Sequence, residues 1–353
     1  MSRAARIALA AIAVFAVSAP LSGLLIDEYG GAAGALEWVL RSLVVVSTAL
    51  ALGAAFVLVL RLRRRVRPRP LGWALTVLAS AVFAFFVVQP AVFAVYLTHL
   101  PTRRAVHDTD LGAAKRPVTL TTASGLRLRG WYVPSRNGAA VAVMHGTGST
   151  RLGVADHARL LVRHGYGVLL FDLHGHGESE GRSTSWAAGF APDADAALDY
   201  LRRRPDVRAG RIGVVGVSLG GEIAIHAAAR RPEWRATVLE GVQGGSPADM
   251  QASRPDPATY ATLTALYGLG RVLGGSAPST SNPEAIERIA PRPLLLLSAG
   301  RGPEARANES YKRRGGPSTE LWNLPDATHA AALRTDPAGY ERRVIGFLDR
   351  ALR

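Results

Sequence analysis

The stretch Ile212-Gly-Val-Val-Gly-Val-Ser218-Leu-Gly-Gly221 decides the fold of this chain. Residues 212–217 form an apolar run typical of a buried strand, and a helix is predicted directly after it, near 220–230. A serine at such a sharp turn is forced onto a strained backbone, which exposes its hydroxyl at the carboxyl edge of a sheet. The flanking glycines remove Cβ atoms that would collide in the turn. This pattern at a strand–helix junction predicts that Ser218 is a nucleophile.

The rest of residues 105–353 alternates short apolar runs with longer amphipathic ones. Strands are predicted at 118–122, 126–133, 139–144, 166–172, 212–217, 236–240, 293–298 and 320–324, and helices near 153–163, 192–204, 220–230, 304–314 and 340–352. A leading hairpin followed by this alternation predicts a mostly parallel sheet with helices on both faces. Residues 241–283, rich in Gly, Ser and Pro with a helical centre at 260–273, are expected to form a small cap over the strand ends.

A second turn at the same predicted sheet edge offers backbone donors. His145-Gly-Thr147-Gly148 follows an apolar strand directly. A tetrahedral oxyanion needs two preorganised donors, and the N–H groups of Thr147 and Leu219 can supply them. For the side chain of His145 we expect a bracing role in the turn rather than proton transfer.

A serine nucleophile needs a histidine as general base and an acid that orients it. Among nine histidines, His329 follows the last predicted strand and precedes the last helix, which places it at the carboxyl edge of the sheet. Glu304, after strand 293–298, is the preferred acid, and Glu240, at the end of the preceding strand, is the alternative. His157 and His164 lie on or beside a helix and are expected to be surface or packing residues.

Several other chemistries find no support in the sequence. The chain has no cysteine, which excludes a cysteine nucleophile and a Cys-ligated metal site. His174 and His176, in Asp172-Leu-His-Gly-His, could approach a zinc ion, but a catalytic site needs a third protein ligand, so no metal is predicted. No phosphate-binding loop of the type GxxxxGK[ST] occurs, and no cofactor is indicated.

The first hundred residues have a different composition. Ile7–Ile26, Ser42–Leu60 and Pro70–Thr102 contain no Asp, Glu, Lys or Arg. About 20 apolar residues suffice to cross the hydrocarbon core of a bilayer. These runs predict a membrane anchor, residues 1–104, with about three transmembrane helices at 7–26, 38–60 and 71–97. The first run is expected to be retained, although cleavage as a signal peptide stays open.

Arginine placement predicts the orientation of that anchor. Residues 61–70 carry six arginines between two predicted spans, whereas the loop before Ser42 carries three acidic residues and one arginine. The positive-inside rule places the arginine-rich loop in the cytoplasm and residues 105–353 outside the cytoplasm, on a multi-pass protein of the cell membrane. The net charge of +15 is therefore no sign of a nucleic-acid partner, since the loop lacks aromatic or base-reading residues.

Residues 118–353 resemble an α/β-hydrolase, most of all the bacterial serine-aminopeptidase-like and esterase-like hydrolases, some of which carry membrane anchors. The resemblance lies in His145-Gly-Thr-Gly-Ser-Thr-Arg151, Gly165-Tyr-Gly-Val-Leu-Leu-Phe-Asp-Leu-His-Gly-His-Gly-Glu-Ser179, Gly216-Val-Ser-Leu-Gly-Gly221 and His329. It implies a Ser–acid–His triad, no cofactor, and hydrolysis of esters, thioesters or small amides. The family usually places an aspartate after strand 293–298, and this chain has none there.

Two hypotheses follow. In the first, the chain is a membrane-anchored serine hydrolase in which Ser218 attacks a small or lipid-like acyl group, His329 moves the proton and Glu304 orients His329. A peptidase of the serine-aminopeptidase type is a variant of it. In the second, the fold serves as a binding protein in the membrane without catalysis, because a fold alone does not establish an activity. No protein partner is indicated.

Overall fold

The computed structural model describes residues 69–83, 90, 102–182, 187–253, 256–274 and 280–352. Contacts divide the chain into two compact units, 1–90 and 91–353. The domain boundary that the sequence suggests, between residues 104 and 105, stays a prediction. Each unit is described by itself.

In the first unit, the structure describes helix α3 (Arg69–Phe83), which has 15 residues. The predicted spans 7–26 and 38–60 lie outside the described residues, and the span 71–97 is described through Phe83 and at Pro90. Among the described helices, none is both long enough and apolar enough to cross a bilayer. The membrane anchor therefore stays a prediction.

The second unit is built around a sheet that, within the described residues, has eight strands. They are β2 (Arg116–Thr121), β3 (Arg127–Val133), β4 (Ala140–Met144), β5 (Gly167–Phe171), β7 (Ile212–Val217), β8 (Ala236–Glu240), β9 (Leu294–Ala299) and β10 (Thr319–Leu324). Their order is β10-β9-β8-β7-β4-β5-β3-β2. The hairpin β2–β3 is antiparallel, β3 is antiparallel to β5, and the other neighbouring strands are parallel, which confirms the predicted mostly parallel sheet.

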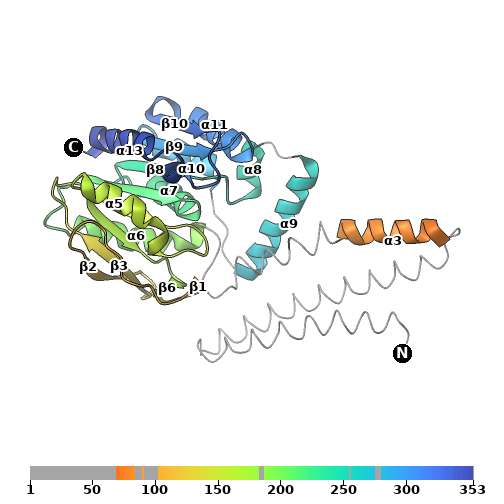
Figure 1. The fold of residues 1–353 in the computed structure, drawn as a ribbon, viewed down its shortest axis with the longest axis horizontal. Coiled ribbons are helices and arrows are strands. Elements are labelled where there is room, and N and C mark those ends of the chain that lie inside the picture. The colour runs from red at the N-terminus through yellow and green to blue at the C-terminus, as the bar shows by residue number, and fades with distance from the viewer. Residues whose placement is uncertain are drawn as a thin grey trace. The chain divides into compact units, whose positions relative to one another are not determined.

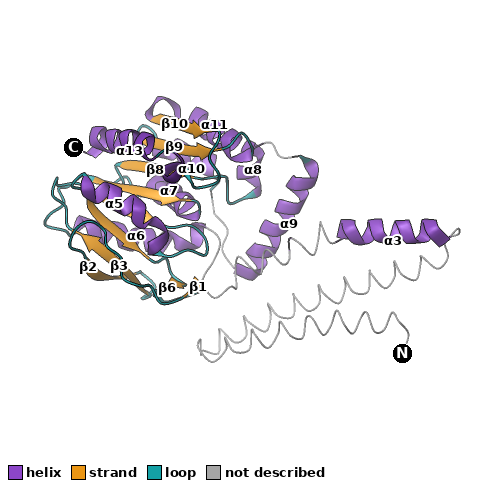
Figure 2. Ribbon diagram, viewed as in Figure 1, coloured by secondary structure: helices purple, strands orange, loops and turns teal. Residues whose placement is uncertain are grey.

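Helices cover both faces of this sheet (Figure 2). The described helices of the unit are η2 (Arg151–Val154), α5 (Ala155–Arg163), η3 (Ala187–Phe190), α6 (Ala191–Arg202), α7 (Leu219–Arg230), α8 (Pro247–Ser253), α9 (Pro257–Gly274), α10 (Asn282–Ile289), α11 (Pro303–Gly315), η4 (Gly316–Ser318), α12 (Ala332–Thr335) and α13 (Pro337–Leu352). Successive strand residues face opposite sides, so each buried strand contributes to two apolar cores. One core includes α6, α7 and α10, and the other includes α5 and α13.

The strand order creates a switch point between β4 and β7. From β4 the chain passes through α5 to β5 on one side, and later returns to β7 on the other side of β4 (Figure 1). Met144 and Gly216, near the carboxyl ends of β4 and β7, are register partners. In open α/β sheets, ligands bind where the strand order reverses in this way, outside the carboxyl ends of the strands.

The region between β8 and β9 contains more regular structure than the sequence suggested. The predicted helical centre at 260–273 corresponds to α9, but α8 and α10 were not predicted. Helix α10 starts with a capping box in which the side chain of Ser281 accepts the N–H of Glu284 and the side chain of Glu284 accepts the N–H of Ser281. This cap and the buried Ile286 and Ile289 fix a short helix that packs against α7 and α11.

Candidate active site

The turn between β7 and α7 holds Ser218 in an unusual backbone conformation. Its φ is 54° and its ψ is −118°, a region that L-residues other than glycine rarely adopt. Ser218 N–H donates to the carbonyl of Glu240 at 2.8 Å, which ties the turn to the neighbouring strand β8. The serine side chain is therefore held at the carboxyl edge of the sheet by the main chain itself.

Glycine is required on both sides of this serine because the backbone passes so closely. A Cβ atom on Gly216 would lie 2.3 Å from the carbonyl oxygen of Gly220, and a Cβ on Gly220 would lie 2.2 Å from the carbonyl oxygen of Met144. Such distances are impossible for real side chains. The two glycines allow the start of α7 to lie against the end of β4, and the N–H groups of Gly221 and Glu222 donate to the carbonyl oxygen of Ser218.

Three of the residues singled out in the sequence form one hydrogen-bonded chain. His329 Nε2 lies 3.0 Å from Ser218 Oγ, and His329 Nδ1 lies 2.8 Å from Glu304 Oε2. The side chain of His329 is 46% exposed, whereas that of Glu304 is 6% exposed. When Nδ1–H donates to the carboxylate, Nε2 carries the lone pair that can accept the serine proton.

Glu304 is itself held in place. It lies in the first turn of α11, where the helix dipole favours a carboxylate, and its Oε1 accepts the N–H of Ala299 at 2.7 Å. The hydrogen bond to this carboxylate, together with its charge, raises the pKa of His329 above the ordinary value, against the opposing effect of burial. The acid thus favours the protonated imidazole, which is the state a general base reaches after it has accepted a proton.

The turn after β4 lies against the serine, as the sequence suggested. A Cβ on Gly146 would be 3.2 Å from Ser218 Cβ. The carbonyl of Gly146 accepts from His145 Nδ1 at 2.8 Å and from the N–H of Ser149 at 3.2 Å. Because the Gly146 carbonyl and the Thr147 N–H belong to the same planar peptide, these bonds also fix the direction of the Thr147 N–H.

His145 braces this turn as a neutral ring. Its side chain is fully buried, and its Nε2 accepts the N–H of Leu173 at 3.1 Å. Burial, with a smaller contribution from His176, lowers the pKa of His145 to about 3. A neutral imidazole with the proton on Nδ1 satisfies both hydrogen bonds, and its burial removes it from proton transfer with a substrate.

Glu240, the alternative acid, is hydrogen-bonded to His157 and not to His329. Its Oε2 lies 2.9 Å from His157 Nε2, and its Oε1 accepts the N–H of Ala332 at 2.8 Å. Burial alone would raise the pKa of Glu240, but these hydrogen bonds and the nearby imidazole hold it below the usual value. Glu240 therefore supports the backbone at Ser218 and the loop after His329, and its carboxylate belongs to His157.

The His174–His176 loop is occupied by internal contacts. His174 Nδ1 lies 2.9 Å from Asp193 Oδ1, and the ring of His174 stacks on Phe190 with centroids 4.3 Å apart. His176 Nδ1 lies 3.0 Å from the carbonyl oxygen of His174. Among the described residues, no group of three His, Cys, Asp or Glu side chains is placed to hold a metal ion. The loop packs beside the turn of His145, with His145 and His176 ring centroids 5.1 Å apart.

One further contact of the acid has no signal in the sequence. Gln243, three residues after β8, donates from Nε2 to Glu304 Oε2 at 3.2 Å. Its side chain thus occupies the same carboxylate oxygen that holds His329. A glutamine in a Gly-, Ser- and Pro-rich segment has no pattern that would single it out.

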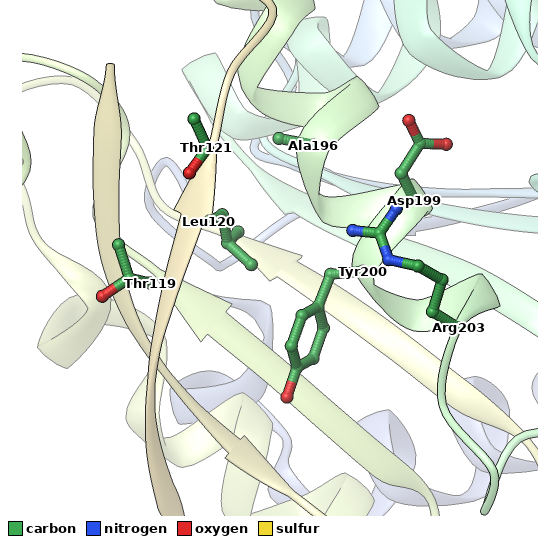
Figure 3. Close-up of a pocket in the computed structure, with 7 residues that line it drawn as sticks. All are labelled: Thr119, Leu120, Thr121, Ala196, Asp199, Tyr200 and Arg203. Carbon is green, nitrogen blue, oxygen red and sulfur yellow. The ribbon is translucent and has the colours of Figure 1, made fainter. Parts of the chain in front are cut away.

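A concave site also lies elsewhere on the molecule. Figure 3 shows the residues that line it. This cavity of about 200 Å³ is lined by Thr119, Leu120 and Thr121 of β2 and by four residues in or directly after α6, namely Ala196, Asp199, Tyr200 and Arg203. Its lining includes none of the three hydrogen-bonded residues around Ser218, and β2 is the edge strand, on the far side of β5 from β4. We therefore place the candidate chemistry at Ser218 rather than in this cavity.

Parts of this chain are similar to known proteins. Residues 135–299 match the family model described as serine aminopeptidase, S33. An uncharacterized protein of Mycobacterium tuberculosis is 40% identical over 122 residues, which cover 34% of this chain and 43% of that protein. The uncharacterized protein YfhR of Escherichia coli is 28% identical over 251 residues, which cover 67% of this chain and 81% of YfhR.

Among solved structures, the chain is similar to the esterase Pf2001 of Pyrococcus furiosus. The TM-score is 0.60 at 25% sequence identity, and the match covers 72% of this chain and 99% of Pf2001. The chain therefore has the α/β-hydrolase fold, and its residues 135–299 are similar to the serine aminopeptidase family S33.

Proposed function

We propose that this chain is a serine hydrolase that cleaves carboxylic esters, with thioesters and small amides as related substrates. The hydrogen-bonded chain from Ser218 through His329 to Glu304 carries the proposal. The Ser218 hydroxyl is hydrogen-bonded to Nε2 of His329, and Nδ1 of His329 is hydrogen-bonded to the buried carboxylate of Glu304. That arrangement activates a serine hydroxyl as a nucleophile.

In the first half of the reaction, Ser218 Oγ forms a bond to the acyl carbon while its proton passes to His329 Nε2. The carbonyl π electrons move onto oxygen, and the N–H groups of Thr147 and Leu219 donate to the resulting oxyanion. The Glu304 carboxylate stabilises the imidazolium without taking its proton. The bond to the leaving alcohol then breaks, and the alcohol oxygen takes the proton from His329.

In the second half, water attacks the acyl group on Ser218 and gives a proton to His329. The tetrahedral intermediate collapses to release the carboxylic acid, and the proton returns to Ser218 Oγ. The exposed position of His329 supports this step, because water must reach both the acyl carbon and Nε2.

Two observations bear on the substrate. The similarity to an esterase of known structure supports ester hydrolysis, whereas the match to the serine aminopeptidase model favours an amide with a free amino terminus as the second candidate. An ester needs less help from the enzyme than an amide, since its leaving alkoxide is the weaker base. We therefore place esters first and test amides beside them.

We further propose that the enzyme is held in the cell membrane by helices at 7–26, 38–60 and 71–97, with its catalytic part outside the cytoplasm and a lipid-like acyl substrate within reach. Helix α3 supports the anchor, since its large apolar side chains are exposed: Leu71 by 48%, Trp73 by 58%, Val77 by 65% and Leu78 by 61%. Exposed apolar surface of this kind is typical of contact with a membrane or a protein.

The enzyme is tested by labelling the full-length protein in detergent with a fluorophosphonate, which reacts with activated serines. We expect labelling of the wild type and of Ser318→Ala, a control that removes a hydroxyl in η4, and none of Ser218→Ala. Hydrolysis of p-nitrophenyl esters and aminoacyl p-nitroanilides by the same samples then ranks esters against amides. Labelling that persists in Ser218→Ala, or is absent from the wild type, would refute the proposal.

Membrane topology needs a separate measurement. An alkaline phosphatase fused after residue 353 is expected to be active in intact cells, and a green fluorescent protein at the same place to be dark, if the C-terminus is outside the cytoplasm. The opposite pair of results would contradict the outward placement without affecting the catalytic proposal.

A further inference from the structure

The chain enters the catalytic unit along the edge of the active site. Strand β1 (Thr102–Arg103) pairs in parallel with β6 (His176–Gly177), and the N–H of Arg104 donates to the Gly177 carbonyl at 2.8 Å. The hydroxyl of Thr102 donates to the Gly175 carbonyl. We call residues 102–106 the lead-in segment. These backbone contacts hold it on the loop that follows β5, next to the buried rings of His145 and His176.

The lead-in segment also reaches the turn of Thr147 directly. Arg104 Nη2 donates to the carbonyl oxygen of Gly148 at 3.3 Å. Gly148 has a φ of 66° and follows Thr147 immediately, so its carbonyl direction depends on a backbone conformation that is easily altered. The Arg104 guanidinium holds that carbonyl and at the same time brings a positive charge to the turn.

A second connection holds the far end of the same turn. The N–H of Val106 lies 3.5 Å from Glu178 Oε1, and Glu178 forms an ion pair with Arg151. Arg151 is 3% exposed, and its N–H donates to Asp172 Oδ1 at 2.7 Å. Arg151 is the last residue of the turn that begins at His145. The lead-in segment therefore contacts this turn near its centre, at Gly148, and at its end, through Glu178.

We propose that the lead-in segment positions the oxyanion donor of this enzyme, with Arg104 as the positioning residue. Arg104 holds the Gly148 carbonyl and thereby the conformation in which the Thr147 N–H faces the acyl oxygen. Its charge also favours the negative oxygen that develops there. This inference rests on the proposed serine hydrolase function, and it gives the residues at the end of the predicted anchor (1–104) a role in positioning the catalytic machinery.

A positioning role makes a specific kinetic prediction. The oxyanion exists in the transition state and not in the bound ester, so disturbing its donor lowers kcat and leaves KM nearly unchanged. Removal of a whole oxyanion donor costs about 100- to 1000-fold in kcat. Arg104→Ala misplaces a donor without removing it, so we expect a smaller loss, about tenfold.

The experiment uses the full-length protein in detergent with p-nitrophenyl butyrate as substrate. Arg104→Ala is compared with Arg104→Lys, which keeps a cationic donor, and with Arg116→Ala, which removes an arginine at the start of the edge strand β2. We expect kcat to fall about tenfold in Arg104→Ala, to recover in part in Arg104→Lys, and to stay unchanged in Arg116→Ala. Affinity for a boronic acid, which forms a tetrahedral adduct with the serine, should fall in parallel with kcat.

The results separate this inference from the proposed function. Unchanged kcat and boronate affinity in Arg104→Ala, with wild-type labelling by fluorophosphonate, would overturn the positioning role alone. The same holds if only KM rises. If Arg104→Ala fails to fold, Arg104→Gln is tested in its place, because it keeps a donor but removes the charge. Wild-type kcat and boronate affinity in both Arg104→Gln and Arg104→Lys would again overturn the positioning role. A wild type without Ser218-dependent labelling refutes the hydrolase itself.

Discussion

Two of the histidine–carboxylate pairs in the described residues have nearly the same length but very different surroundings. His329 lies 2.8 Å from Glu304, and His157 lies 2.9 Å from Glu240. The second ring nitrogen of His329 meets a serine hydroxyl, whereas that of His157, Nδ1, is buried with no hydrogen-bond partner in the part of the chain that the structure describes. The His329 side chain is 46% exposed and the His157 side chain 10%.

This difference shows that a carboxylate bound to an imidazole does not define a general base. A base must also present its free nitrogen to a nucleophile and to solvent. Glu304 lies in the first turn of α11, beyond the end of β9, so its partner His329 can lie where solvent reaches the site. Glu240 ends the buried strand β8 and faces α5, so the pair that it forms with His157 joins a helix to the sheet.

Replacing each histidine in turn tests directly which of the two acts as the general base. His329→Asn should lower kcat about 10⁴- to 10⁶-fold, because no other group can take the Ser218 proton, while the melting temperature stays close to that of the wild type. His157→Asn should destabilise the fold by about 3 kcal/mol, since Glu240 loses its buried partner, and reduce kcat far less. Ester hydrolysis and thermal unfolding are measured for both variants. If His157→Asn abolished turnover, His157 and not His329 would be the general base.

Replacing the two carboxylates is the next largest test. Glu304→Gln should lower kcat about 10³- to 10⁴-fold, because a neutral amide neither fixes the tautomer of His329 nor stabilises its protonated form. Glu240→Gln should instead cost about 2 to 3 kcal/mol of stability, with a modest loss of kcat, since one buried hydrogen-bonded charge is removed. Denaturant unfolding beside ester kinetics separates the two effects. Complete loss of turnover in a folded Glu240→Gln protein would mean that Glu240 is the acid.

A third histidine, His145, has no carboxylate partner, and it should affect how the stability of the fold depends on pH. His145 is buried with a pKa lowered to about 3, so folding favours its neutral form. Its contribution is present above the unfolded value of about 6.5 and is lost as pH falls from there toward 3. His145→Asn should therefore be less stable near neutral pH, yet lose less stability on acidification. Urea titrations at several pH values measure this slope, and equal slopes in both proteins would contradict it.

Replacing Glu304 should also shift the pH profile of kcat/KM by a small amount. The base acts in its neutral form, so kcat/KM rises as pH passes through the raised pKa of His329. Glu304→Gln removes the main cause of that raised pKa, and the rising limb should move to lower pH. Residual activity measured over roughly pH 5 to 9 tests this, with Glu240→Gln as the control whose limb moves much less. An unmoved limb in Glu304→Gln would show that another group sets the pKa.

The local parts of this site were predictable from the sequence. The Gly-x-Ser-x-Gly turn, the hairpin and the alternating strands and helices all depend on residues that are neighbours in the chain. His329 could be found because it follows the last strand of a parallel sheet, whose carboxyl ends lie on one edge. The same reasoning left Glu304 and Glu240 as alternatives, because both follow strands at that edge.

What decided between the two carboxylates is packing, which the sequence does not display. Glu240 is hydrogen-bonded to His157 of α5, and Gln243 donates to Glu304 from a segment without periodicity. The contact of Arg104 with Gly148 joins residues 44 positions apart, and a two-residue strand such as β1 has no pattern of its own. Contacts of this kind depend on the tertiary fold.

The backbone of Ser218 places function and stability in direct opposition. A φ of 54° with a ψ of −118° costs an L-residue about 1 to 3 kcal/mol, whichever side chain it carries. Ser218→Gly should then melt at a higher temperature than Ser218→Ala, although both lack the nucleophile, and calorimetry of the two inactive proteins measures the difference. A relative of this fold that has lost its catalytic activity would then gain stability from glycine at position 218, and glycine at that position would indicate a protein without the hydrolase activity.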